Sequence, residues 1–79
     1  MRIIGEIPHP DCKIVIFSWN NRYLLKFESG HLEQTYKINQ HDISDESELY
    51  RLADEVFVQH ALTMFEQMGR SLEEALHRV

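Results

Sequence analysis

The sequence predicts an α+β protein, a four-stranded antiparallel β-meander followed by a long C-terminal α-helix packed on one face of the sheet. Three observations predict this fold. Residues 1–40 alternate apolar and polar side chains with the period of two that is typical of strands. Residues 44–79 instead repeat apolar side chains every three or four positions, as a helix does. The 79 residues form a single domain, because domains typically hold about 50 to 250 residues.

Four segments of the β-meander are rich in β-branched and aromatic residues, as strands are. Pro8 and Pro10 separate the first two segments, because proline cannot donate a hydrogen bond to a sheet. Asn20-Asn21 and Ser29-Gly30 suit two-residue hairpin turns, in which the backbone adopts positive φ angles. The expected strands are Arg2 to Ile7, Cys12 to Trp19, Arg22 to Glu28 and His31 to Ile38.

The two turns also predict the strand register, and the register decides which side chains face the helix. It places Glu6 opposite Lys13 and Lys26 opposite Glu33, two cross-strand pairs of opposite charge. A slip by one residue would turn the polar side chains of the last strand toward the core. The residues expected to face the helix are Ile3, Ile7, Ile14, Ile16, Leu25, Phe27, Leu32, Gln34, Tyr36 and Ile38.

The helical part begins near Ser44 and Asp45, whose side chains are good N-caps. Gly69 favours a break or bend, after which Leu72 to Arg78 forms a short last helix. A helix continuous through Gly69 is the alternative, because one glycine costs only about 1 kcal/mol. The apolar stripe expected to cover the sheet consists of Leu49, Leu52, Val56, His60, Met64 and Met68.

Composition and charge exclude several classes of protein. With 43% hydrophobic and 27% charged residues the chain is neither collagen-like, disordered nor membrane-spanning. The net charge of −5 opposes a broad basic face for duplex DNA, although the charge of residues 1–40 alone is slightly positive. The lone Cys12 excludes an internal disulfide and fits a reducing compartment, and no signal peptide is visible. We therefore expect a cytoplasmic protein.

No catalytic motif is present, so neither enzymatic activity nor a cofactor is expected. The sequence contains no glycine-rich phosphate loop, no nucleophile elbow and no His-Glu-x-x-His. His9 and Cys12 are metal-ligating residue types, but no second pair of ligands accompanies them, so a turn is the preferred interpretation. His60 lies on the apolar stripe, where we expect it to be partly buried and hydrogen-bonded to Tyr23 or Tyr36.

Both the helix and the far face of the sheet carry more apolar residues than one core requires. This surplus predicts a homodimeric protein-interaction module, whose partner is a second copy or an unidentified protein and not a membrane. Single-stranded nucleic acid is the alternative partner, although too few cations are present to favour it. The candidate interface consists of Val15, Phe17, Trp19, Leu24, Val58, Leu62 and Phe65. The alternative nucleic-acid patch consists of Phe17, Trp19, Arg22 and Lys37.

Three segments carry a resemblance to known proteins: Ile4 to Pro10, Trp19 to Tyr23 and Leu32 to Lys37. In these segments the chain resembles a set of short bacterial proteins of no assigned function. Its predicted layout is also similar to that of Pur-alpha-type repeats, which pair up and bind single-stranded nucleic acid. This second likeness concerns the fold alone and implies no functional residues.

Overall fold

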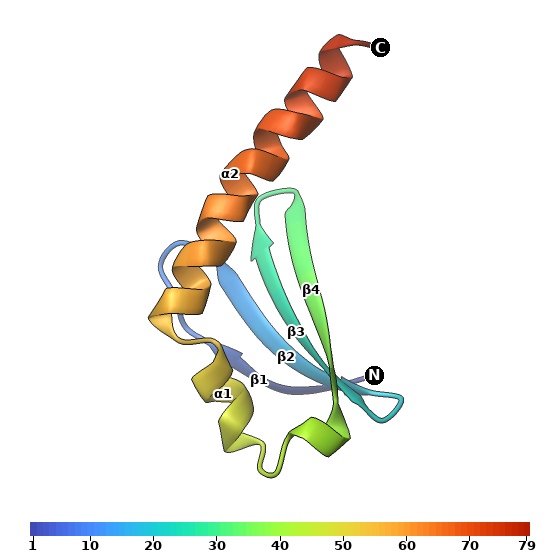
Figure 1. Cartoon of the computed structure of the whole chain (residues 1–79), viewed down its shortest axis with the longest axis vertical. Helices are drawn as coiled ribbons and strands as arrows, with labels where there is room; N and C mark the ends of the chain where they lie inside the picture. The colour runs from blue at the N-terminus through green and yellow to red at the C-terminus, as the bar shows by residue number, and fades with distance from the viewer.

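Four antiparallel strands form an open sheet whose order follows the chain, and the helices lie against one face of it (Figure 1). The computed structural model describes residues 1–79. The predicted α+β fold is confirmed. None of the helices combines the length and the apolarity that crossing a membrane requires. The elements are β1 (Arg2–Ile7), β2 (Lys13–Trp19), β3 (Arg22–Ser29), β4 (Leu32–Asn39), η1 (Gln40–Asp42), α1 (Ser47–Leu52) and α2 (Glu55–His77).

The two hairpin turns follow the sequence prediction to different degrees. Asn20 and Asn21 have φ angles of 53° and 62°, which confirms the predicted two-residue turn between β2 and β3. Between β3 and β4 the turn residues are Gly30 and His31, because Ser29 still belongs to the sheet. Of these residues only Gly30 has a positive φ, of 59°, as the first position of a type II′ turn requires.

The later turn shifts the register of β3 and β4 by two residues. Lys26 lies opposite Thr35, so the prediction of Glu33 as its directly opposite partner is wrong. The Nζ atom of Lys26 still reaches carboxylate oxygens of Glu28 at 3.3 Å and of Glu33 at 3.4 Å. Because side chains of a strand alternate between faces, a shift of two residues leaves each of them on its predicted face.

A β-bulge in β1 changes the prediction for the first strand. Pairing with β2 slips after Ile3, so that Ile4 is the extra residue and turns toward the core, whereas Ile3 is exposed. The prediction that Ile3 faces the helix is therefore wrong. Glu6 lies opposite Val15 and not Lys13, because the loop before β2 is longer than predicted.

The helical part is interrupted earlier than predicted. α1 ends before Ala53, and Asp54 then caps α2 by accepting a hydrogen bond from the backbone N–H of Phe57 at 2.9 Å. α2 runs through Gly69 to His77 without a break, so the predicted break near Gly69 and the separate last helix are wrong. A capping aspartate stabilises a new helix start, whereas one glycine costs a continuous helix only about 1 kcal/mol.

Asp45 acts at the start of α1 as predicted, although the regular helix begins at Ser47. Its carboxylate accepts a hydrogen bond from the backbone N–H of Ser47 at 3.1 Å. Glu48 reaches back and accepts from the backbone N–H groups of Asp45 at 2.9 Å and of Ser44 at 2.6 Å. The contact of Glu48 with Asp45 is one half of a capping box, whereas Asp45 accepts from Ser47 and not from Glu48, and Ser44 contributes only its backbone.

The hydrophobic core fills the space between the sheet and the two α-helices. The break at Ala53 resets the helical phase, so a different face of α2 packs on the sheet from the one predicted. Leu52, Val56, His60 and Met64 are exposed, Val56 by 66%, and the prediction that they cover the sheet is wrong. The buried core residues are Ile14, Ile16, Leu25, Phe27, Leu49, Ala53, Val58, Ala61 and Phe65.

Candidate functional site

The residues of the candidate interface fall on two separate surfaces. The first group lies on the sheet face away from the helices and comprises Val15, Phe17, Trp19 and Leu24. The second group lies on the side of α2 that faces the sheet and comprises Val58, Leu62 and Phe65. A single flat interface does not include both groups.

The α2 residues of the candidate interface are occupied within the chain. Val58 and Phe65 belong to the hydrophobic core, and Leu62 is half-buried against it. Their apolar surface packs on the chain's own sheet, because the phase of α2 differs from the predicted one. A partner therefore has little access to these three residues.

The sheet residues of the candidate interface are more accessible, though unevenly so. Val15 and Leu24 are buried at the centre of the open face, even though no helix covers it, and Phe17 is half-buried. Trp19 is the exposed aromatic residue of this face, with 44% of its surface open to solvent.

A surface that was not predicted lies on the C-terminal part of α2. The helix continues past the turn between β3 and β4 and leaves the sheet behind (Figure 1). We call residues 69–79 the overhang. Leu72 and Leu76 are exposed by 39% and 63%, although they prolong the face on which Val58 and Phe65 pack. The signal was present in the sequence, because apolar residues recur at three- and four-residue steps from Val58 to Val79.

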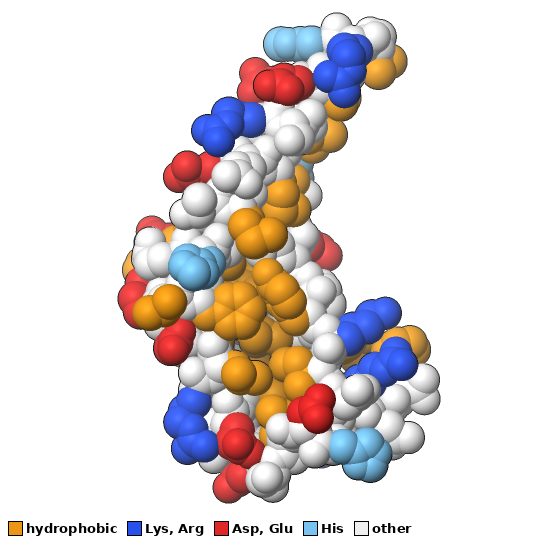
Figure 2. Space-filling view, viewed as in Figure 1, with side chains coloured by type: hydrophobic (Ala, Val, Ile, Leu, Met, Phe, Trp, Pro, Cys, Tyr) orange, Lys and Arg blue, Asp and Glu red, His pale blue; other side chains and the backbone are white.

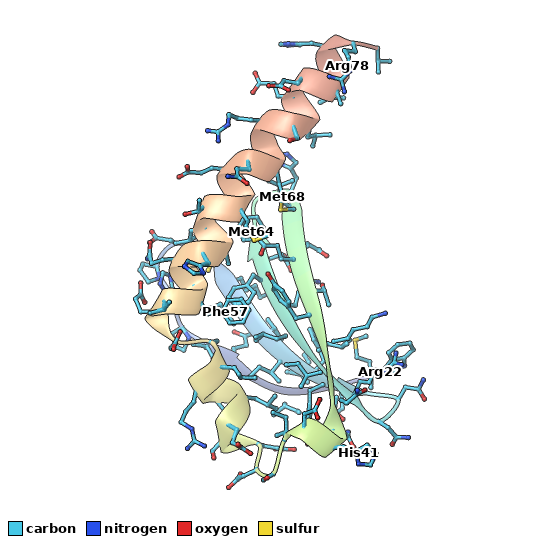
Figure 3. The ribbon with its side chains drawn as sticks, in the orientation of Figure 1. Arg22, His41, Phe57, Met64, Met68 and Arg78 are labelled. Carbon is cyan, nitrogen blue, oxygen red and sulfur yellow. The ribbon has the colours of Figure 1, made fainter.

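A space-filling view shows where this surface lies (Figure 2). Hydrophobic side chains gather at the centre of the molecule, beside α2, and continue along the side of the helix toward its C-terminal end. Phe57 and Met68 point from α2 toward the sheet side of the helix and pack against the core (Figure 3). Phe57 also packs in an aromatic cluster with Phe27 and Tyr36, at centroid distances of 5.4 and 5.1 Å.

A groove of ≈ 600 Å³ lies where the overhang leaves the sheet. Its apolar floor belongs to α2, and His31 of the turn between β3 and β4 forms the opposite wall. Charged residues of α2 form the rim. The helix residues that line it are Phe65, Glu66, Gly69, Arg70, Leu72, Glu73 and Leu76.

The four residues of the alternative nucleic-acid patch all lie on the open face of the sheet. Trp19 lies opposite Arg22 across β2 and β3, and Leu24 lies between Phe17 and Lys37. Arg22 and Lys37 are exposed and form no ion pair. Arg22 stands at the hairpin end of the sheet, at the opposite end of the molecule from Arg78 (Figure 3).

Lys26 does not add a free cation to this patch. Its hydrogen bond to Glu28 raises the pKa of the Lys26 ammonium, and Glu33 acts in the same direction. The charge of Lys26 is therefore balanced by two carboxylates of the same face. Two unpaired cations remain in the patch, Arg22 opposite Trp19 and Lys37 opposite Leu24.

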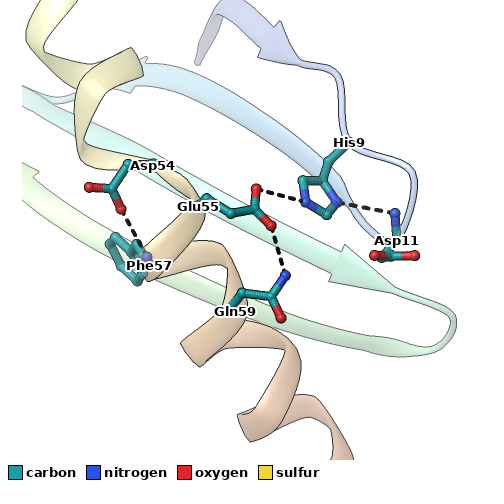
Figure 4. Close-up of polar contacts among 6 residues, drawn as sticks. All are labelled: His9, Asp11, Asp54, Glu55, Phe57 and Gln59. Carbon is teal, nitrogen blue, oxygen red and sulfur yellow. Dashed lines mark hydrogen bonds and ion pairs between the residues drawn. The ribbon is translucent and has the colours of Figure 1, made fainter.

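His9 joins the loop after β1 to the start of α2 (Figure 4). The backbone N–H of Asp11 donates to Nδ1 of His9 at 3.1 Å, so the neutral ring carries its proton on Nε2. Nε2 in turn lies 3.4 Å from Oε2 of Glu55, and the side-chain amide of Gln59 donates to the other carboxylate oxygen, Oε1, at 2.7 Å. Gln59 first, and His9 second, lower the pKa of Glu55. Both ring nitrogens of His9 thus have protein partners.

Cys12 and His60 take no part in a chemical site that the structure describes. Burial raises the pKa of the Cys12 thiol, and the nearby carboxylates of Asp11 and Glu55 add to this. His60 is exposed, so the expectation of a partly buried His60 bonded to a tyrosine is wrong. No group of three or more His, Cys, Asp or Glu side chains is arranged to hold a metal ion.

No protein-family model matches this chain, and searches of curated proteins and of solved structures find no match to it. The likenesses noted in the sequence therefore stay predictions.

Proposed function

We propose that the chain is a small homodimeric protein-interaction module of the cytoplasm and not an enzyme. One observation carries this proposal: the apolar face of α2 continues beyond the sheet, where the chain has nothing to cover it. Helix faces of this kind are normally buried against a partner. The overhang therefore replaces the predicted residues Val58, Leu62 and Phe65 as the helical part of the interface.

The proposal is tested by the mass of the protein in solution. We expect light scattering to report a dimer at a concentration of tens of micromolar. Leu72→Glu should shift the protein to a monomer, because it places a charge in the apolar face of the overhang. Leu72 does not pack against the core, so circular dichroism should show an unchanged fold.

Gln67→Glu is the matched control for Leu72→Glu. It introduces the same charge in the same part of α2, but on the solvent side of the helix, where Gln67 is exposed. This variant should remain a dimer. A wild-type protein that is monomeric at tens of micromolar contradicts the proposal.

Single-stranded nucleic acid binding is the second candidate function. It is favoured by the placement of Phe17, Trp19, Arg22 and Lys37 on one open face, where aromatic rings adjoin unpaired cations. Two unpaired cations are few for phosphate binding, which depends on several cations acting together. Self-association is the function that the geometry supports better.

A further inference from the structure

We infer that the overhang pairs with the overhang of a second copy in antiparallel orientation, with the twofold axis close to Ser71 and Leu72. This inference rests on the proposed function and specifies its partner surface. Each helix would lie along the groove of the other, so that the apolar floor of both grooves is covered by one symmetric contact.

A row of charged side chains on the rim of the groove favours antiparallel pairing. Glu66, Arg70, Glu73 and His77 recur at i, i+4, i+7 and i+11 and therefore lie along one flank of the helix. None of them forms an ion pair within the chain. Three of the four line the groove itself.

The charges of this row are complementary to those of the same row on a second helix that runs in the opposite direction. A twofold axis between two antiparallel helices brings the same flank of both copies together. Glu66 then lies beside His77 of the second copy, and Arg70 lies beside Glu73 of the second copy. Each pairing occurs twice, so every charge in the row gains a neighbour that can be its counter-ion or hydrogen-bond partner.

Parallel pairing has the opposite effect. A twofold axis along two parallel helices places the row of one copy beside the opposite flank of the other, where Met68 and Ala75 lie, so the charged side chains gain no counter-ion. The charge pattern therefore selects a second copy of this chain in one orientation.

The same register also matches the apolar residues. Met68 of one copy lies at the level of Ala75 of the other, so a large side chain meets a small one. Met64, which is exposed, lies at the level of Val79 of the second copy. The contact thus covers apolar residues on both sides of the twofold axis.

Disulfide cross-linking tests the orientation. Cys12→Ser provides a background without other thiols, and Met68→Cys and Ala75→Cys are made separately in it. In the antiparallel pair two identical positions of this set are about 10 Å apart along the helices, since each residue rises about 1.5 Å. A disulfide needs Cα atoms within about 7 Å. We therefore expect a covalent dimer on oxidation of the mixture of both variants and not of either variant alone.

A charge exchange tests the pairing of the row. Arg70→Glu should weaken the dimer about tenfold, because two exposed ion pairs become two repulsive contacts. Adding Glu73→Arg should restore the wild-type dissociation constant, measured by sedimentation. Glu74→Arg is the control, because Glu74 lies outside the row.

The outcomes separate this inference from the proposed function. A wild-type dimer in which the mixture does not cross-link, or in which either cysteine variant cross-links alone, has another arrangement and overturns the inference, while the proposed function stands. Failure of Glu73→Arg to restore the dimer also overturns it. A wild-type monomer overturns both.

Discussion

Gln34 of β4 donates a hydrogen bond from its side-chain amide to the backbone carbonyl of Ala61 in α2, at 2.8 Å. Gln34 is the one buried polar residue of the chain. Its amide oxygen also accepts a hydrogen bond from the hydroxyl of Tyr36 at 3.1 Å. The residue therefore fastens the long helix to the last strand and places the overhang beyond the sheet.

Replacing Gln34 by alanine should lower the free energy of unfolding by about 1–3 kcal/mol, the cost of breaking a buried hydrogen bond. Urea unfolding measures the effect. Thr35→Ala is the matched control, because Thr35 is its exposed neighbour on the opposite face and should change stability by no more than about 0.5 kcal/mol. Equal losses for both variants would show that the contact with Ala61 does not stabilise the fold.

Gly69→Ala should stabilise the protein by up to about 1 kcal/mol, because alanine is the better helix former. An added Cβ atom at Gly69 meets only Leu32, at an ordinary contact distance of 3.8 Å. Thermal unfolding in the Leu72→Glu background measures this without a contribution from self-association. Gly5→Ala should instead destabilise the protein, because the added Cβ atom would collide with the hydroxyl of Tyr50. A destabilising Gly69→Ala would mean that α2 bends at this position.

The contribution of Glu55 to stability should disappear in acid. Its pKa in the folded state lies below the ordinary value of 4.5, so the unfolded chain binds the proton more readily. Stability from Glu55 is therefore complete above pH 4.5 and is lost as the pH falls through the lowered pKa. Wild-type protein should unfold at a higher urea concentration than Glu55→Gln at neutral pH, and this difference should vanish in acid.

Gln59→Ala provides the comparison for Glu55. It removes the hydrogen bond that lowers the pKa of Glu55 most, and should therefore reduce the acid sensitivity without abolishing it. If the difference between wild type and Glu55→Gln were the same at every pH, the contacts of Glu55 would not depend on its charge.

Single-stranded oligonucleotides should bind no tighter than about 10 μM at physiological salt, because the patch offers phosphates just two unpaired cations, Arg22 and Lys37. Trp19 is the only tryptophan, so its fluorescence reports directly on the open face. A salt-dependent quench at sub-micromolar protein that Arg22→Ala or Lys37→Ala abolishes would make nucleic-acid binding the function.

The sequence predicted the class of each element because alternation and helical spacing are local properties. It also predicted the faces of β3 and β4, since the shift at Gly30 is an even number of residues. The bulge at Ile4 and the break at Ala53 could not be predicted from alternation and helical spacing, because both depend on how distant segments pack. A single extra residue turns Ile3 outward, and a single break turns Val56 outward.

The candidate site was predicted less well than the fold, for a related reason. The prediction that Val58, Leu62 and Phe65 are surplus to the core is wrong, because it depended on a helical phase that the break at Ala53 changes. The overhang could have been recognised only by assuming a continuous helix through Gly69. The pairing of Trp19 with Arg22 was predicted correctly, since it depends on the Asn20-Asn21 turn alone, whereas Lys37 lies opposite Leu24 and not Arg22 because of the shift at Gly30.

The order of the strands has a consequence for how the chain folds. Each strand pairs with the next one along the chain, so each step of sheet formation closes only a short loop and costs little entropy. Docking of α2 is the step that joins distant segments, since Gln34 and Ala61 are 27 residues apart. Proteins rich in local contacts fold fast. The meander can therefore assemble first as hairpins, with the helix arriving last, and losing the Gln34 contact should speed unfolding more than it slows folding.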